Sequence, residues 1–96
     1  MATVKVNLNA GDIKNGTPGD PCMCPVALAC TRAGLTGVKV YGKDIELFYN
    51  GDFRVYRVSH QVESFVKIYD GEEPGEPTPL EFEIDLDSYW EDAVAP

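Results

Sequence analysis

The fold is decided by the stretch Ile45-Glu46-Leu47-Phe48-Tyr49-Asn50-Gly51-Asp52-Phe53-Arg54-Val55-Tyr56-Arg57-Val58. Two runs rich in β-branched and aromatic residues flank the dipeptide Asn50-Gly51. Both central residues of a type I′ turn need positive φ, which asparagine and glycine adopt most readily. The stretch therefore predicts a β-hairpin with strands at residues 45–49 and 53–58.

The chain after the hairpin predicts a helix and a further strand. Ser59 is a suitable helix N-cap, and Gly71 is a suitable stop. Between them, apolar residues recur at three- and four-residue spacing and form one helix face. After an acidic, proline-rich loop, residues 80–86 alternate apolar and acidic side chains, which is typical of a half-buried strand. The apolar helix positions are Val62, Phe65, Val66 and Tyr69.

The chain before the hairpin predicts two strands and one helix. Residues 38–41 and 3–8 alternate as strands. Pro25 suits the first position of a helix, because it lacks only an N–H that would be unpaired there, and Gly34 suits the end. Residues 9–16 predict at most one helical turn. The expected element order is β-α-β-β-β-α-β, an α+β domain with a mainly antiparallel sheet and two helices on one face.

The 96 residues predict one domain over residues 1–88, followed by a short acidic tail at 89–96. A chain of this length buries a modest core, so we expect it to form a homo-oligomer. Tyr89 and Trp90 in the tail have two readings that stay open. They mark an interface, or they fold back against the sheet.

The charge is distributed unevenly along the chain, whose net charge is −8. Residues 68–96 carry ten acids and no base, whereas residues 1–67 carry six acids and eight bases. The phosphates of a nucleic acid would repel the net negative charge of the whole molecule, so a general nucleic-acid-binding role is not expected. A local cationic pocket for a small anion remains compatible with this pattern. The acidic end is either a solubilising surface or a docking surface.

Targeting signals and cysteine number favour the cytoplasm. The sequence has no run of about 18 apolar residues, so no membrane association is expected. Its N-terminus lacks the apolar region of a signal peptide. Three cysteines is an odd number, unlike a secreted disulfide framework, and free thiols are the default in a reducing compartment.

All three cysteines lie in Gly19-Asp20-Pro21-Cys22-Met23-Cys24-Pro25-Val26-Ala27-Leu28-Ala29-Cys30. Structural zinc sites use four ligands, usually in pairs spaced two to four residues apart. Cys22 and Cys24 are closer than that, and His60 is the single histidine. We therefore expect no metal and no cofactor. Cys24 at a helix N-terminus is expected to have a lowered pKa, with His60 as a conceivable base, or else to be simply buried. No catalytic triad is legible, so no catalytic residue and no enzymatic activity are expected.

A Gly-rich loop leads into the same helix and predicts a site for a small anion. Free N–H groups and the helix dipole hold phosphates at such positions, although the spacing matches no nucleotide-binding fingerprint. Arginines and the histidine elsewhere would add positive charge, or else they are ordinary solvated surface residues. The predicted ligand-binding residues are Gly16, Thr17, Gly19, Cys24, Arg32, Arg54, Arg57 and His60.

Several segments resemble a family of small uncharacterised proteins found in bacteriophages and prophages. The N-terminal segments are Asp12-Ile13, Gly16, Gly19-Asp20 and residues 24–29 (Cys-Pro-Val-Ala-Leu-Ala); the C-terminal ones are residues 64–71 and 79–84. The resemblance spans most of the chain. It implies a phage origin and expression in the host bacterial cytoplasm, and it implies no particular activity. The chain differs from the family pattern in its loop, which reads Cys22-Met23-Cys24-Pro25 where the family often has Cys-x-x-Cys-Pro.

Two function classes follow from these observations. The first is a non-enzymatic phage accessory protein with an anti-defence role, which binds and sequesters a small anionic, nucleotide-type immune signal of the host. The second is an acidic inhibitor or polyanion mimic that docks on a host protein. Phage-like residues, small size and the Gly-rich helix entry favour the first. The ten carboxylates without a base favour the second.

Overall fold

The computed structural model describes residues 3–88, and the acidic tail with Tyr89 and Trp90 lies outside the described residues. The α+β class and the predicted element order are confirmed, with one short helix added. The elements are β1 (Thr3–Leu8), α1 (Ala10–Asn15), α2 (Pro25–Arg32), β2 (Thr36–Val40), β3 (Asp44–Tyr49), β4 (Asp52–Arg57), α3 (His60–Tyr69) and β5 (Leu80–Asp85).

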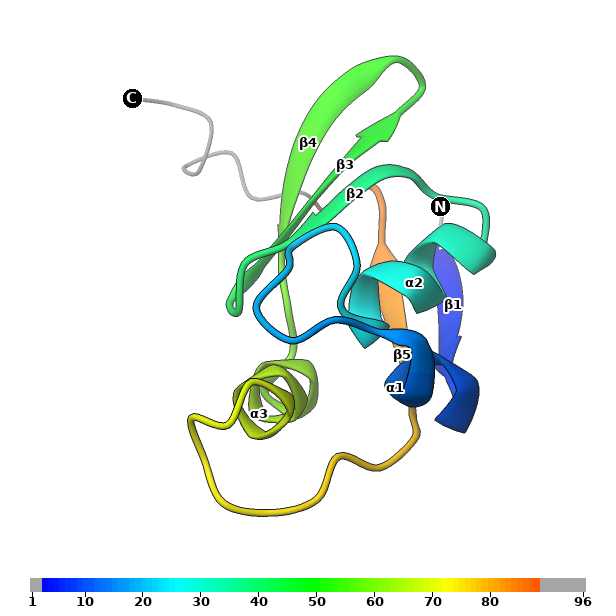
Figure 1. The fold of residues 1–96 in the computed structure, drawn as a ribbon. Coiled ribbons are helices and arrows are strands. Elements are labelled where there is room, and N and C mark those ends of the chain that lie inside the picture. Colours follow the sequence, from blue (N-terminus) through cyan, green and yellow to red (C-terminus); the bar gives the residue numbers. More distant parts are fainter. Residues whose placement is uncertain (1–2, 89–96) are drawn as a thin grey trace.

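The strands pair antiparallel, as expected, and they do so in two separate sheets. The first and last strands, β1 and β5, form one sheet, and β2-β3-β4 form the other. The turn between β3 and β4 has φ of 53° at Asn50 and 82° at Gly51, which confirms the predicted hairpin. Figure 1 shows this hairpin extending away from the body, with β1 and β5 behind α2.

Side chains rather than a strand ladder join the two sheets. The backbone carbonyl of Leu86, just after β5, accepts a hydrogen bond from the Tyr56 hydroxyl at 2.8 Å and from Arg54 Nη1 at 3.2 Å. Both donors come from β4, so β4 and the end of β5 are held together without backbone pairing. Arg54 therefore has a structural role in holding β4 to the end of β5.

The short helix α1 is formed by residues for which the sequence predicted at most one turn. It begins with a capping box in which the Asn9 side chain accepts from the Asp12 N–H at 3.0 Å, and the Asp12 carboxylate accepts from the Asn9 N–H at 2.9 Å. The sequence has the spacing of a capping box, with Asp12 three positions after Asn9. The third helical position usually holds Glu or Gln, so the Asp12 at that position makes the motif harder to recognise.

Helix α2 occupies the centre of the molecule and contacts both β1 and β2. Its buried residues are small, which lets the helix approach both sheets closely. Helix α3 begins at the predicted cap, where the Ser59 hydroxyl accepts from the Val62 N–H at 3.4 Å. Three of its four predicted apolar positions, Val62, Phe65 and Val66, are buried, and the fourth, Tyr69, is partly buried against the core. Within residues 3–88, no helix combines the length and apolarity that crossing a membrane requires.

Candidate functional site

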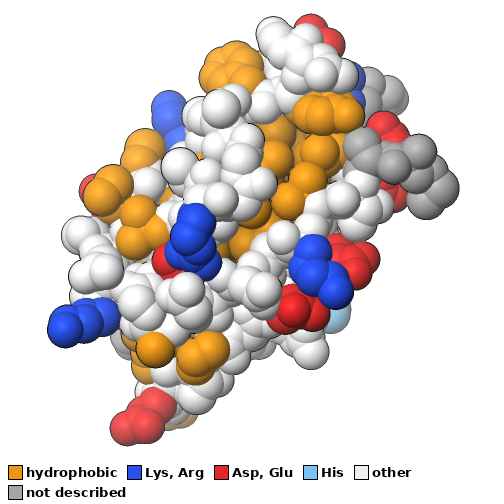
Figure 2. Space-filling model, turned by 90° about the vertical axis from the view of Figure 1, so that its right-hand side faces the viewer, with side chains coloured by type: hydrophobic (Ala, Val, Ile, Leu, Met, Phe, Trp, Pro, Cys, Tyr) orange, Lys and Arg blue, Asp and Glu red, His pale blue; other side chains and the backbone are white. Residues whose placement is uncertain are grey.

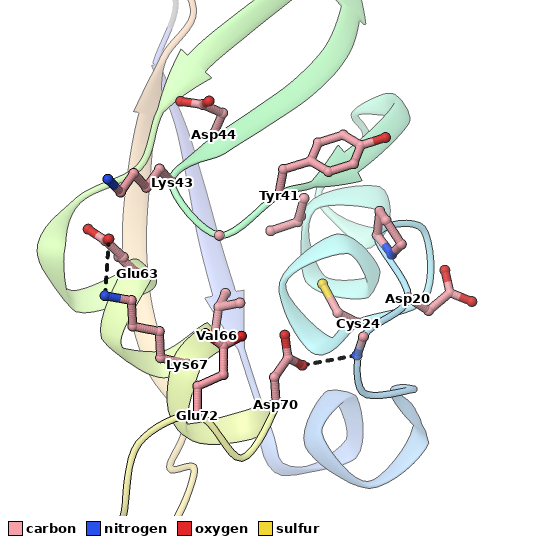
Figure 3. A pocket seen from close by; sticks show the side chains of 14 residues that line it. Asp20, Cys24, Tyr41, Lys43, Asp44, Glu63, Val66, Lys67, Asp70 and Glu72 are labelled. Atoms are coloured by element: carbon pink, nitrogen blue, oxygen red, sulfur yellow. Dashed lines mark hydrogen bonds and ion pairs between the residues drawn. The ribbon is translucent and has the colours of Figure 1, made fainter.

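A pocket of about 460 Å³ lies between the start of α2 and helix α3. Three segments form its walls: the loop that leads into α2, the turn between β2 and β3, and α3 with the residue pair that follows it (Figure 3). We call it the α2–α3 pocket. Its lining residues are Gly19, Asp20, Pro21, Cys24, Val40, Tyr41, Gly42, Lys43, Asp44, Glu63, Val66, Lys67, Asp70 and Glu72.

The loop into α2 is held in shape by its own hydrogen bonds. The Asp20 carboxylate accepts from the Cys22 N–H at 2.9 Å, and the Asp20 carbonyl accepts from the Cys24 N–H at 3.0 Å. The Pro21 carbonyl accepts from the Val40 N–H at 2.9 Å, which ties the loop to the end of β2. These contacts place one wall of the pocket on rigid elements.

The Gly19 N–H, which the sequence predicted to be free for an anion, already has an acceptor within the chain. It donates to the Asp70 carboxylate at 3.0 Å, across 51 positions of sequence (Figure 3). Asp70 follows α3 directly, so this bond joins the two segments that form facing walls of the pocket. A ligand anion at Gly19 would have to compete with a carboxylate that is already there.

The Cys24 thiol does not have the lowered pKa that its place at a helix N-terminus predicted. Burial raises its pKa, because the side chain is only 6% exposed and a thiolate is poorly solvated there. The N–H groups of Ala27 and Val26 oppose this shift, and the charge of Asp70 adds to it. Of the two alternatives for Cys24, the activated thiol is therefore wrong, because desolvation outweighs the helix terminus, and the buried residue is confirmed. For Cys30, burial raises the pKa to about 12.

Acidic groups outnumber basic ones around the pocket. Five of its lining residues are acids and two are lysines. Two of the acids are neutralised locally: Glu63 pairs with Lys67 at 3.5 Å, and Asp44 pairs with Arg57 at 3.3 Å. The remaining acids, Asp20, Asp70 and Glu72, exceed the remaining lysine, Lys43. The potential in the pocket therefore favours a cation.

Arg32 lies at the opposite end of α2 from the pocket. It pairs with Asp12, with 2.9 Å between Nη2 and Oδ2, and it also donates to the Asn7 carbonyl. Asp12 is 5% exposed. Burial alone would raise the Asp12 pKa, but the hydrogen bonds from Arg32 and the Asn9 backbone, with the charge of Arg32, outweigh it and lower that pKa. Arg32 thus fastens α2 to β1 and α1.

The other predicted cationic residues are also dispersed. Arg54 bonds the Leu86 carbonyl and lies 5.2 Å from the centre of the Tyr49 ring. Arg57 pairs with Asp44 from outside the pocket lining, and His60 begins α3 on the surface. Figure 2 shows cationic side chains scattered singly over one face, some of them beside acidic ones.

Of the eight predicted ligand-binding residues, only Gly19 and Cys24 line the α2–α3 pocket. Gly16 and Thr17 have structural partners: the Gly16 N–H donates to the Asp12 carbonyl at 2.9 Å, and the Thr17 N–H donates to the Met23 carbonyl at 2.8 Å. Tyr41 and the acids of α3 and its C-terminal end were not among the predicted residues. No local signal placed those residues opposite the loop, because they come from distant parts of the chain.

The cysteines and acids do not assemble a metal site in the part of the chain that is described. Between residues 3 and 88, no three or more histidine, cysteine, aspartate or glutamate side chains are grouped so as to hold a metal ion. All three cysteines are free thiols, with Cys22 exposed and Cys24 and Cys30 buried.

No protein-family model matches the chain, and no curated protein or solved structure matches it either. The resemblance to phage and prophage proteins stays a prediction from the sequence.

Proposed function

We propose that the protein is a small, non-enzymatic binding protein whose α2–α3 pocket takes a small ligand that carries positive charge. The observation that carries this proposal is the pocket itself, about 460 Å³ in volume and lined by five acids against two lysines. Ligand pockets in proteins commonly fall between about 300 and 1,000 Å³. Tyr41 lines the pocket and is 51% exposed, and aromatic side chains of this kind bind cations.

The state of Cys24 supports binding rather than covalent catalysis. A nucleophilic thiol needs a lowered pKa or an adjacent base. Burial raises the pKa of Cys24, and His60 does not line the pocket. The thiol therefore serves as a small apolar part of the pocket wall.

The sequence-based proposal of an anionic, nucleotide-type ligand has weaker physical support at this pocket. Arg32, Arg54 and Arg57 make their contacts elsewhere, and Asp70 occupies the Gly19 N–H. A role as a phage accessory protein against host defence, acting in the host cytoplasm, remains a proposal. It is supported by the resemblance and by three free thiols, which suit a reducing compartment.

A thermal-shift comparison of cations with anions tests the proposal. Spermidine, agmatine and arginine methyl ester form the cationic set, and cyclic dinucleotides and ADP-ribose form the anionic set. A ligand at ten times its Kd adds about 1.4 kcal/mol to the free energy of unfolding. That raises the Tm of a domain of about 100 residues by roughly 5–10 °C. We expect such a rise with at least one cation and none with the anions.

Two adjacent acids provide a matched pair of variants. Glu72 lines the pocket and Glu73 does not, and both are exposed. Glu72→Lys should abolish the shift, whereas Glu73→Lys changes the chain charge equally and should keep it. Anions alone raising the Tm would refute a cationic ligand. Equal losses in both variants would show that the shift reflects overall charge rather than this pocket.

The acidic outer face of the β1–β5 sheet favours the second candidate function, docking on a basic protein. Glu81 and Glu83 are exposed, and Asp85 shares their face by strand alternation. Lys5 is opposite Glu83 in register and pairs with Glu81 at 3.7 Å, so one base faces three acids. This surface lies on rigid strands, which suits a docking site better than a solvated loop does.

Poly-L-lysine, titrated by calorimetry at low and high salt, is a suitable probe for that acidic face. Glu81→Gln with Glu83→Gln should weaken binding at low salt several-fold, since charge steering acts locally. Glu72→Gln with Glu73→Gln removes the same charge from the loop and serves as the control. Equal weakening by both pairs would mean that net charge, rather than the sheet face, drives binding.

A further inference from the structure

The outer face of the β2-β3-β4 sheet exposes a pair of aromatic side chains. Phe48 of β3 and Phe53 of β4 are directly opposite in register, and each is 48% exposed. Their ring centroids are 5.8 Å apart in an edge-to-face arrangement at 65°. The alternate residues of β3, Ile45 and Leu47, point the other way and are almost completely buried. Strand alternation thus places the pair on the face opposite the core. Val55 of β4, which is opposite Glu46 on that same face, is only 4% exposed, so the face is not exposed throughout.

The position of Phe48 is fixed by its neighbour on β2. Gly37 has φ of +63°, and a Cβ built there would lie 2.5 Å from the Phe48 ring. The ring therefore packs directly against the Gly37 backbone, where any side chain would displace it. The aromatic pair is held on a rigid surface, as the anchors of protein interfaces usually are.

The charges on the same face cancel. By register and alternation, Lys39 lies opposite Glu46, and Arg57 lies opposite Asp44, with which it also forms an ion pair at 3.3 Å. Two bases and two acids make this face neutral, in a chain whose net charge is −8. We call the surface formed by Lys39, Asp44, Glu46, Phe48, Phe53 and Arg57 the aromatic sheet face.

We propose that the aromatic sheet face is the contact between two copies of this chain. A strongly basic or acidic partner gains little electrostatic attraction from a neutral face. A basic partner would bind the acidic β1–β5 face more favourably. Two copies at −8 repel each other over most of their surfaces, and least where charge cancels. A symmetric dimer places one patch on itself, which a neutral patch with an aromatic centre permits.

The size of the face sets the expected strength of the dimer. One strand of five residues and two of six cover roughly 14 by 20 Å. A standard stable interface buries about 800 Å² on each partner, which is more than this flat area provides. The dimer is therefore reversible, and it forms as the concentration rises from about 10 µM towards about 1 mM.

Sedimentation equilibrium of the full chain over that concentration range tests the proposal. Phe53→Thr keeps a strand-forming residue and should raise the dimer Kd at least about tenfold, as loss of an aromatic anchor does. Met23→Thr is the control, since Met23 is 45% exposed and outside the sheet. For charge, Lys39→Glu should weaken the dimer more than Lys14→Glu, which makes the same change on α1.

Circular dichroism and Tm measurements on each variant separate unfolding from loss of association. A folded Phe53→Thr variant that stays monomeric, with a dimeric Met23→Thr variant, supports the aromatic sheet face. A wild-type chain that stays monomeric up to about 1 mM overturns the proposal. A dimer that Phe53→Thr and Lys39→Glu leave intact also overturns it, because association would then use another surface.

Discussion

The two ends of helix α2 are held in opposite ways. At its C-terminal end, Arg32 pairs with the nearly buried Asp12 and bonds the Asn7 carbonyl, so helix, α1 and β1 are fastened together. At its N-terminal end, the Cys24 side chain makes no capping hydrogen bond, and the residue lines a pocket. The C-terminal end of α2 is held by an ion pair, and its N-terminal end forms part of the wall of a candidate binding site.

This difference shows why the cysteine-containing loop lacks the anion site and the activated thiol that its sequence suggests. The arginine expected to attract a ligand neutralises an internal carboxylate instead. The N-terminal end stays open because its loop is shaped by backbone hydrogen bonds and by Asp70. Variants at the two ends should therefore differ in kind: loss of stability at one end and change in binding at the other.

The largest effect is expected at the fastened end. Asp12→Ala removes the α1 capping box and the carboxylate that Arg32 binds, so it should lower the free energy of unfolding by about 2–4 kcal/mol. Asp20→Ala removes one exposed hydrogen bond at the open end and should cost less than about 1 kcal/mol. Urea unfolding measures both. Equal losses would mean that the two ends are held equally.

The loop into the open end contains two glycines that are required for different reasons. A Cβ at Gly16 would lie 2.7–2.9 Å from the ring and N of Pro25, so Gly16→Ala should cost about 1–3 kcal/mol. Gly19 has φ of +75° with nothing within 4 Å, so Gly19→Ala should cost roughly 1 kcal/mol through backbone strain.

Asparagine separates these two causes in the same unfolding assay. Gly19→Asn should recover much of the loss, since asparagine tolerates positive φ. Gly16→Asn should be at least as harmful as Gly16→Ala, because its Cβ meets the same atoms. Recovery at both positions would remove the steric argument for Gly16.

The pH dependence of the free energy of unfolding should reflect the Asp12–Arg32 pair at the C-terminal end of α2. The Asp12 pKa is lower in the folded protein than its ordinary value of 3.8, so the unfolded chain binds protons more readily. The resulting stability is fully present above that ordinary value and is lost as the pH falls through the folded pKa. Asp12→Asn should flatten this acid limb of the stability curve relative to the wild type. An unchanged acid limb in Asp12→Asn would contradict the assigned shift.

The smallest change in stability is expected at the open end. Cys24→Ser supplies a hydroxyl that can accept from the first N–H groups of α2, so stability should change by less than about 1 kcal/mol. Cys30→Ser buries a hydroxyl in the core and should cost about 1–3 kcal/mol. In the wild type, iodoacetamide should label exposed Cys22 at least about tenfold faster than Cys24. Comparable labelling at both would restore an accessible, activated thiol.

Local features of the fold were predictable because their causes lie within a few residues. The Asn50-Gly51 turn, the Ser59 cap and the apolar face of α3 appear as expected, and the strand predicted at residues 80–86 is observed as Leu80–Asp85. The division into two sheets was not predictable. The contact that joins the two sheets was not predictable either, because Tyr56 and Arg54 of β4 bond the Leu86 carbonyl across 30 and 32 positions of sequence.

The candidate site was less predictable than the fold. Gly19 and Cys24 were found from the helix-entry motif, and both line the pocket. The acids that give the pocket its excess charge are Asp20, from the loop into α2, and Asp70 and Glu72, which follow α3. The sequence left the acidic end of the chain open as a solubilising or a docking surface, since nothing local indicates which charges a fold will bring together.

The amino-acid sequence by itself determined the strands, the helices and their caps, because hydrophobic period and turn chemistry act between near neighbours. Only the tertiary structure decided the sign of the pocket's charge, the partners of the arginines and the raised pKa of Cys24. Each of these depends on exclusion of water and on distant groups brought within a few ångströms, where electrostatic energies are set.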